Sequence, residues 1–275
     1  MAIADFGRIL HIHHLDGATF RPAPFVRLPT HVVVMECDQG IVLVDTGLGV
    51  ADMRHTTRRL GPFVYPLAPV LDESRTVLRQ LEALGFRAED VTDIVATHLD
   101  YDHIGGASDF PTARVHVSAP ELEAAFTRVG PRARIRYRRV HLDALGETTA
   151  YGETDTQVLG LAGHCIDTRE QVYLVPMPGH THGHAAVVIQ DPARGWLIAA
   201  GDAAMHRNSI TPGPAAPWPA RAAERALAMN TGRVAENHHL LSELAAKGHR
   251  VFCSHDSVQL ATLRAESALI APSPP

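Results

Sequence analysis

Thr97-His-Leu-Asp-Tyr-Asp-His-Ile-Gly-Gly106 is the stretch that decides the fold of this chain. Potential metal ligands at positions 98, 100, 102 and 103 follow directly after the apolar run Ile94–Ala96. A loop held by a rigid strand can aim several side chains at one point. A lone His or Asp would indicate only a polar turn, but without a cation two imidazoles and two carboxylates this close would repel one another or lose their hydration without compensation. Zinc, iron and manganese accept this ligand mixture, so the stretch predicts a metal site.

The secondary structure around this stretch follows from apolar patterning and from glycine and proline signals. Gly105 and Gly106 are expected to let the backbone turn tightly without a Cβ clash. Helices are predicted at 73–84, 120–128 and 220–247, with Gly232 as a candidate break, and loop at 46–72. Strands are predicted at 8–13, 30–37, 40–45, 93–96, 114–118, 171–175, 185–190, 196–200 and 251–253.

The organisation predicted from these elements is one layered α/β domain over residues 1–275, because strands and helices intermix without a repeat or a linker. Residues 129–170 have little apolar periodicity and are predicted to form an insertion or lid. With 275 residues, the chain is long enough to bury a substantial core.

Composition argues against two kinds of partner, nucleic acid and membrane. The net charge of -5 argues against a nucleic-acid partner, because binding a phosphate backbone requires a basic face. No apolar run is long enough to span a bilayer, and Met1–Asp5 lacks the features of a signal peptide. We therefore expect a cytoplasmic protein without membrane contact. The three cysteines are far apart, which argues against a disulfide framework and a cysteine-rich zinc module.

Four further polar residues each follow an apolar run, where a buried strand would meet a loop. They are found in Val-Leu-Val-Asp45-Thr-Gly, Pro-Gly-His180-Thr-His-Gly-His184, Ala-Ala-Gly-Asp202-Ala and Phe-Cys-Ser-His255-Asp. Each alone could be a turn or surface residue. Together with residues 98–106, and in this order, they resemble the motifs of the metallo-β-lactamase fold superfamily over about residues 30–256.

The resemblance implies an α/β fold, the four-layer αββα sandwich, with a two-metal site along one edge of the sheets. It assigns His98, Asp100 and His180 to the first metal. The second metal would take Asp102, His103 and His255, with Asp202 bridging the two ions. It also implies that Asp45 orients the ligand loop and that His184 braces the loop carrying His180.

Asp100 departs from the common family pattern, which has histidine at this position. With Asp100 the ligand set holds three carboxylates, and a bridging hydroxide would bring four negative charges against two divalent cations. The extra carboxylate either favours iron or manganese over zinc, or loosens the first site because aspartate is shorter than histidine. Two divalent ions are expected, zinc first, with iron or manganese as alternatives.

The function implied by the resemblance is metal-dependent hydrolysis. A hydroxide bridging the two ions would attack the carbonyl of a lactone, ester or thioester of a small acid. Asp102 or Asp202 would then carry the proton to the leaving group. Lactonases of the superfamily carry a tyrosine three residues after the bridging aspartate, where this chain has Met205, so His206 is the candidate to assist the leaving group.

Six arginines occur between residues 128 and 139, at 128, 132, 134, 136, 138 and 139. They form either an electropositive rim that attracts an anionic small-molecule substrate, or a solvated face that balances nearby acids. The sequence leaves both interpretations open.

Three other functions remain alternatives to the hydrolase. Asp100 makes a non-haem iron oxygenase or oxidoreductase on the same fold conceivable. Nuclease activity is disfavoured by the acidic balance. A metal-poor binding protein would follow if Asp100 abolished the first metal position.

Overall fold

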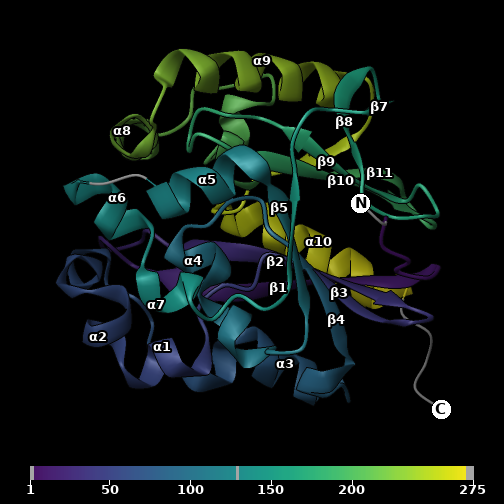
Figure 1. Ribbon diagram of the computed structural model, residues 1–275. Helices are drawn as coiled ribbons and strands as arrows, with labels where there is room; N and C mark the ends of the chain where they lie inside the picture. Colours follow the sequence, from purple (N-terminus) through teal and green to yellow (C-terminus); the bar gives the residue numbers. More distant parts are fainter. Residues whose placement is uncertain (1–2, 128–129, 271–275) are drawn as a thin grey trace.

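The computed structural model describes residues 3–127 and 130–270. Two mixed sheets pack face to face, with helices on both outer sides (Figure 1). The first sheet has the order β1 (Ile9–Phe20), β2 (Leu28–Cys37), β3 (Gly40–Val44), β4 (Val91–Val95), β5 (Arg114–Ser118), β6 (Thr148–Tyr151). The second sheet has the order β12 (Arg250–Phe252), β11 (Gly195–Ala199), β10 (Ala185–Asp191), β9 (Val172–Pro176), β8 (Leu161–Cys165), β7 (Thr156–Val158).

Helices form the two outer layers of the sandwich, except that α10 packs against β1 and contributes Leu263 to the core between the sheets. In Figure 1, α8 and α9 lie over the second sheet, and α1 to α3 lie on the side of the first sheet. Their bounds are α1 (Val50–Arg54), α2 (Thr56–Leu60), α3 (Val77–Ala83), α4 (Tyr101–Ile104), α5 (Ala119–Thr127), α6 (Pro131–Arg136), α7 (Arg139–Leu142), α8 (Trp218–Leu227), α9 (Thr231–Ala246) and α10 (Ser257–Ile270). The predicted αββα architecture is confirmed.

Apolar side chains fill three layers between these elements. Val33, Val44 and Leu174 belong to the core between the two sheets. Leu81 of α3 joins the core on the outer face of the first sheet, and Leu241 of α9 joins that of the second. Because both faces of the central strands are buried, their sequences are almost continuously apolar, as the strand predictions required.

The structure differs from the sequence-based expectation in several places, and β1 runs to Phe20 where the predicted strand ends at residue 13. The segment 46–72 contains α1 and α2, and the long helix predicted at 220–247 is interrupted at Ala228–Asn230, before Gly232. Of the predicted lid, only α6 and α7 are helical additions, because β6 to β8 complete an edge of each sheet. α10 was not predicted. The ends of the predicted lid and of the helix 120–128 fall partly on Arg128 and Val129, outside the described residues.

No helix in residues 3–127 and 130–270 combines the length and apolar character needed to cross a bilayer.

Candidate metal centre

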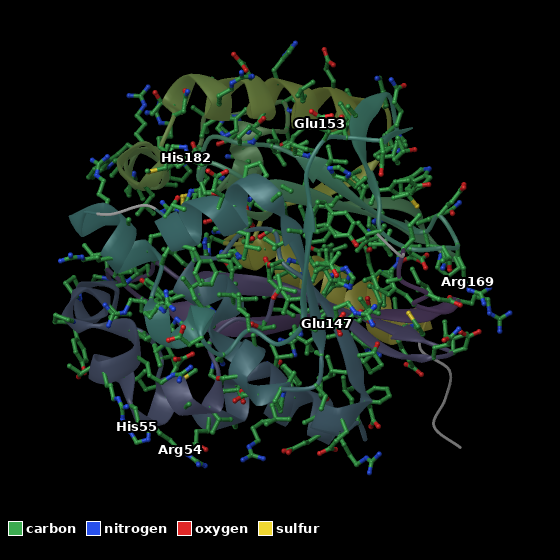
Figure 2. The ribbon with its side chains drawn as sticks, viewed as in Figure 1. Arg54, His55, Glu147, Glu153, Arg169 and His182 are labelled. Carbon is green, nitrogen blue, oxygen red and sulfur yellow. The ribbon has the colours of Figure 1, made fainter. Side chains whose placement is uncertain are left out.

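The candidate ligands gather at the ends of strands from both sheets. β3, β4 and β5 run parallel, so the loops that follow them leave the first sheet at one edge. β11 and β12 are also parallel, and the loops after them carry Asp202 and His255. The loop that carries His180 also carries His182, which Figure 2 labels near α5 and α8. Arg169 is labelled at the opposite side of the molecule. The αββα topology therefore joins motifs that are up to about 200 residues apart in the sequence.

The side chains form two clusters. Within each cluster, the potential ligand atoms lie within 4.8 Å of one another. One cluster consists of His98, His180 and Asp202. The other consists of Asp102, His103 and His255. Asp100 lies beside the first cluster, with its Oδ2 3.1 Å from His180 Nε2 and 3.4 Å from His98 Nε2.

Asp202 lies between the two clusters. One carboxylate oxygen is 3.4 Å from His180 Nε2 in the first cluster. In the second cluster, the carboxylate is 3.5 Å from His103 Nε2 and 3.2 Å from His255 Nε2. This position is the one that a carboxylate bridging two ions would need.

Hydrogen bonds to Nδ1 orient three of the four candidate ligand imidazoles. His103 Nδ1 lies 2.8 Å from Asp45 Oδ2, and His255 Nδ1 donates to Pro29 O at 2.7 Å. His98 Nδ1 is 2.9 Å from the Thr97 hydroxyl, which itself donates to Asp45. Such partners select the tautomer in which Nε2 carries the lone pair that a metal requires.

Asp45 holds the ligand loop through its backbone as well. Its Oδ1 accepts the Thr97 amide at 2.8 Å, and its own φ of +59° places it in the left-handed region. The adjoining Thr46–Gly47 turn packs directly on the end of the ligand loop. A Cβ at Gly106 would lie 2.5 Å from Thr46 O. Gly105 has an ordinary φ of -57°, so the expected tight turn is not the reason for the two glycines. They are required because the neighbouring loop leaves no room for a Cβ.

Glu121 joins the two main ligand loops, and sequence reasoning missed it. Its buried carboxylate accepts the Leu99 amide at 3.0 Å and the Gly183 amide at 3.1 Å. The approach is so close that a Cβ at Gly183 would lie 2.0 Å from the Glu121 nitrogen. At the start of a helix, Glu121 resembles an ordinary first-turn acid; only the fold shows its contacts.

His184 acts on the loop that carries Asp202. Its Nε2 accepts the Asp202 amide at 2.9 Å, while its backbone carbonyl accepts the Met177 amide at 2.8 Å. Burial holds the pKa of His184 well below its ordinary value, so the ring stays neutral and can accept.

The electrostatics of the second cluster call for positive charge. Burial alone would lower the pKa of His103, but Asp202 and Asp45 raise it to about 10. At His255, burial likewise lowers the pKa, but Asp202 raises it to about 9. Without a metal, the neighbouring carboxylates therefore keep His103 and His255 protonated near neutral pH, with a combined charge of two. A divalent cation would bring the same positive charge to the cluster.

The residues present fit a pair of divalent metal ions. Within the described part of the chain, four buried atoms of these residues lack a hydrogen-bond partner: His98 Nε2, His103 Nε2, Asp100 Oδ1 and Asp202 Oδ1. Buried polar atoms are rarely left unsatisfied. Imidazole nitrogens with carboxylate oxygens suit zinc, iron and manganese.

A pocket of about 360 Å³ opens beside the two clusters. Asp100, Asp102, His180, Asp202 and His255 form its polar part. Its apolar wall comes from β1, β2, α6, α8 and the loops near them, with side chains Phe20, Leu28, Leu67, Ile135, Met205, Ala223, Ala226, Leu227 and Met229.

His206 does not line this pocket. Its Nδ1 accepts the Asn208 amide at 3.1 Å, which turns the ring toward the following 3-10 helix. Tyr101 does line the pocket, between Asp100 and Asp102 in the sequence. Burial, with the two aspartates, raises the pKa of Tyr101 above its ordinary value, so its phenol remains protonated at neutral pH.

The arginine-rich segment serves several roles, and Arg128 lies outside the described residues. Arg136 is buried and donates to Asp100 Oδ2 at 2.7 Å. Arg138 donates to the Arg59 carbonyl at 2.9 Å, and Arg139 pairs with Asp143 at 2.7 Å. Arg132 is exposed and lines the pocket. The described segment is thus neither a uniform rim nor a uniform solvated face.

Comparison with known proteins agrees with this geometry. The family model of the metallo-beta-lactamase superfamily matches residues 26–255. A protein of Mycobacterium tuberculosis named "probable metallo-hydrolase" is 38% identical over 257 residues, which cover 91% of this chain and 81% of the relative. An N-acyl homoserine lactonase of Bacillus cereus is 26% identical over 208 residues, covering 74% of this chain and 75% of the relative.

A solved structure supports the same fold. The structure of an N-acyl homoserine lactone hydrolase, with N-hexanoyl-L-homoserine bound at its catalytic metal centre, has a TM-score of 0.68. It is 20% identical and covers 92% of this chain and 96% of its own. The chain therefore belongs to the metallo-beta-lactamase superfamily and is a hydrolase enzyme of that fold, with divalent metal ions as its expected cofactors.

Proposed function

We propose that this chain is a dinuclear metal hydrolase that cleaves a lactone or ester carrying an apolar acyl group. The observation that carries the proposal is the position of Asp202 within 3.5 Å of ligand nitrogens of both clusters. His98, Asp100 and His180 would hold the first ion with Asp202, and Asp102, His103 and His255 the second. The ions would be zinc first, with iron or manganese as alternatives.

Two bound ions would supply a hydroxide at neutral pH and polarise the carbonyl. The chain's own residues would then bind the substrate and move protons. Asp102 and Asp202 lie at the polar end of the pocket, where either can accept a proton and deliver it to the leaving oxygen. The protonated phenol of Tyr101 takes the assisting role that the sequence suggested for His206, because Tyr101 lines the pocket.

The wall of the pocket supports an apolar acyl group as the part of the substrate next to the carbonyl. Phe20, Leu28 and Leu227 contribute apolar surface close to the carboxylates of the site. Contact with such a wall stabilises a buried chain by roughly 0.8 kcal/mol for each methylene. The relative from Bacillus cereus, named an N-acyl homoserine lactonase, acts on a substrate of this kind. Arg132, exposed at the pocket, can contact an anionic group of the substrate.

The test combines elemental analysis of protein purified without added metal with anaerobic assays on lactones and esters of increasing acyl length. We expect two ions per chain, turnover without oxygen, and kcat/KM that rises from acetyl to hexanoyl substrates. A chelator should abolish turnover and zinc should restore it. One ion or none, with no turnover after reconstitution with zinc, manganese or iron, would contradict the proposal. Oxygen consumption by an iron-loaded chain would favour the oxygenase alternative instead.

A further inference from the structure

Arg136 contacts the carboxylate of Asp100, a proposed ligand of the first metal position. It ends α6, and only 9% of the residue is exposed. One nitrogen of its guanidinium donates to Asp100 Oδ2 at 2.7 Å, and another donates to the Leu227 carbonyl at 2.7 Å. Leu227 is the last residue of α8, so the guanidinium also lies at the negative end of that helix. A buried guanidinium held by two acceptors has a fixed position.

The Asp100 carboxylate can serve Arg136 and an ion at the same time. A carboxylate has about four lone-pair sites on two oxygens. Oδ2 accepts from Arg136 and faces His180 and His98, while Oδ1 is buried without a hydrogen-bond partner among the described residues. Metal-ligating carboxylates are commonly hydrogen-bonded in this way, which fixes their orientation.

Arg136 also balances the charge that Asp100 adds. An isolated carboxylate in a buried site is strongly disfavoured, and so is an isolated guanidinium. The Arg136 guanidinium, 2.7 Å from Asp100 Oδ2, supplies the opposite charge that this carboxylate requires. The pair as a whole carries no net charge, as a neutral imidazole would.

We propose that Arg136 is a positioning residue that neutralises and orients Asp100, so that the Asp100–Arg136 pair fills the place of one neutral ligand in the first metal position. This inference rests on the dinuclear site of the proposed function. It explains why an extra carboxylate need not overload the site with negative charge. The Arg136 side chain also connects α8, which forms part of the pocket wall, to the ligand loop.

The test is a double-mutant cycle of Asp100→His and Arg136→Met, measured as Co²⁺ stoichiometry and affinity of the metal-free protein by titration and visible absorption. Asp100→His leaves an unpaired guanidinium beside a dication, so we expect first-site affinity to fall at least about tenfold. Adding Arg136→Met to Asp100→His should restore affinity at least about tenfold, because the repulsion is removed. In the native background, Arg136→Met should leave affinity unchanged or weaker.

Two variants separate this role from a general structural one. Arg136→Lys keeps the charge but loses the fork that holds Asp100 and the Leu227 carbonyl together, so its first-site affinity should lie between those of the native chain and Arg136→Met. Arg134→Met, on the same helix and exposed, is the matched control and should bind Co²⁺ as the native chain does. If Arg136→Met does not fold, Asp100→His alone still decides the matter, since Co²⁺ binding as tight as in the native chain would overturn the inference.

The outcomes distinguish this inference from the function on which it rests. A native chain that binds fewer than two equivalents of Co²⁺ contradicts the dinuclear function, and this inference with it. Two equivalents, with the same effect of Arg136→Met in the native and the Asp100→His backgrounds, contradict only the role of Arg136.

Discussion

The two proposed metal positions of the site are built differently. In the second, His103 and His255 are oriented by Asp45 and by the Pro29 carbonyl, and the neighbouring carboxylates raise their pKa values to about 10 and about 9. In the first, His180 Nδ1 has no hydrogen-bond partner among the described residues, and the extra carboxylate of Asp100 is paired with Arg136.

This difference shows that the orientation of the ligand side chains and the charge balance of a metal position can come from different residues. The second position has fixed imidazoles and an excess of negative charge, so it should hold its ion more tightly. The first position has its charge balanced by a cation of the protein, so its ion should exchange more readily. Sequential loading of the two positions is the expected consequence.

The largest effect is expected from Asp202→Ala, which removes the side chain shared by both positions. We expect kcat/KM to fall at least about a thousandfold, the loss of several kcal/mol of transition-state stabilisation, and both ions to bind more weakly. Elemental analysis and assays at saturating zinc measure this. Asp202→Asn is the isosteric comparison, and a variant that retains two tightly bound ions would contradict the shared role.

Asp45→Asn should affect the second position more than the first, because Asp45 contacts His103 directly but reaches His98 only through Thr97. Asparagine tolerates the left-handed backbone at this residue, but it removes the charge that faces His103 Nδ1. We expect second-position affinity to fall about 10- to 100-fold, the usual cost of losing such a partner. Co²⁺ titration resolves the two positions. Equal weakening of both would show that Asp45 supports the whole loop and not one ion.

Tyr101→Phe tests the pocket residue that lies between Asp100 and Asp102 in the sequence. Loss of one hydrogen bond to the leaving oxygen should lower kcat about tenfold, with the content of metal unchanged. His206→Ala is the comparison, since its ring faces Asn208, and we expect a change below about twofold. A larger loss in His206→Ala than in Tyr101→Phe would return the assisting role to His206.

The last comparison concerns the pH dependence of the metal-free chain. His103 and His255 have folded pKa values of about 10 and about 9, above the ordinary 6.5. Their contribution to stability is therefore full below pH 6.5 and is lost as the pH rises through 9 to 10. Thermal melting of the chelated chain should show Tm falling across this window. The zinc-loaded chain should fall less, because the ions replace the protons; equal slopes would argue against ions at these residues.

The sequence predicted the elements whose signal is local. β3 was expected at 40–45 and is Gly40–Val44, because a strand buried on both faces requires a run of apolar residues. The short strands β6 to β8 were missed, since edge strands can be polar and are stabilised by their neighbours. α1 and α2 were missed because each has only five residues, too few for helical periodicity.

The sequence by itself determined which residues are chemically able to form a metal site, because ligand types and the apolar runs before them are properties of short segments. It could not choose Arg136 among six arginines or show that Glu121 joins two loops. Both depend on long-range contacts, Arg136 with Asp100 and Leu227, and Glu121 with Leu99 and Gly183. Only the tertiary structure decided which charges meet, because residues distant in the chain come within hydrogen-bond range only when both sheets have formed.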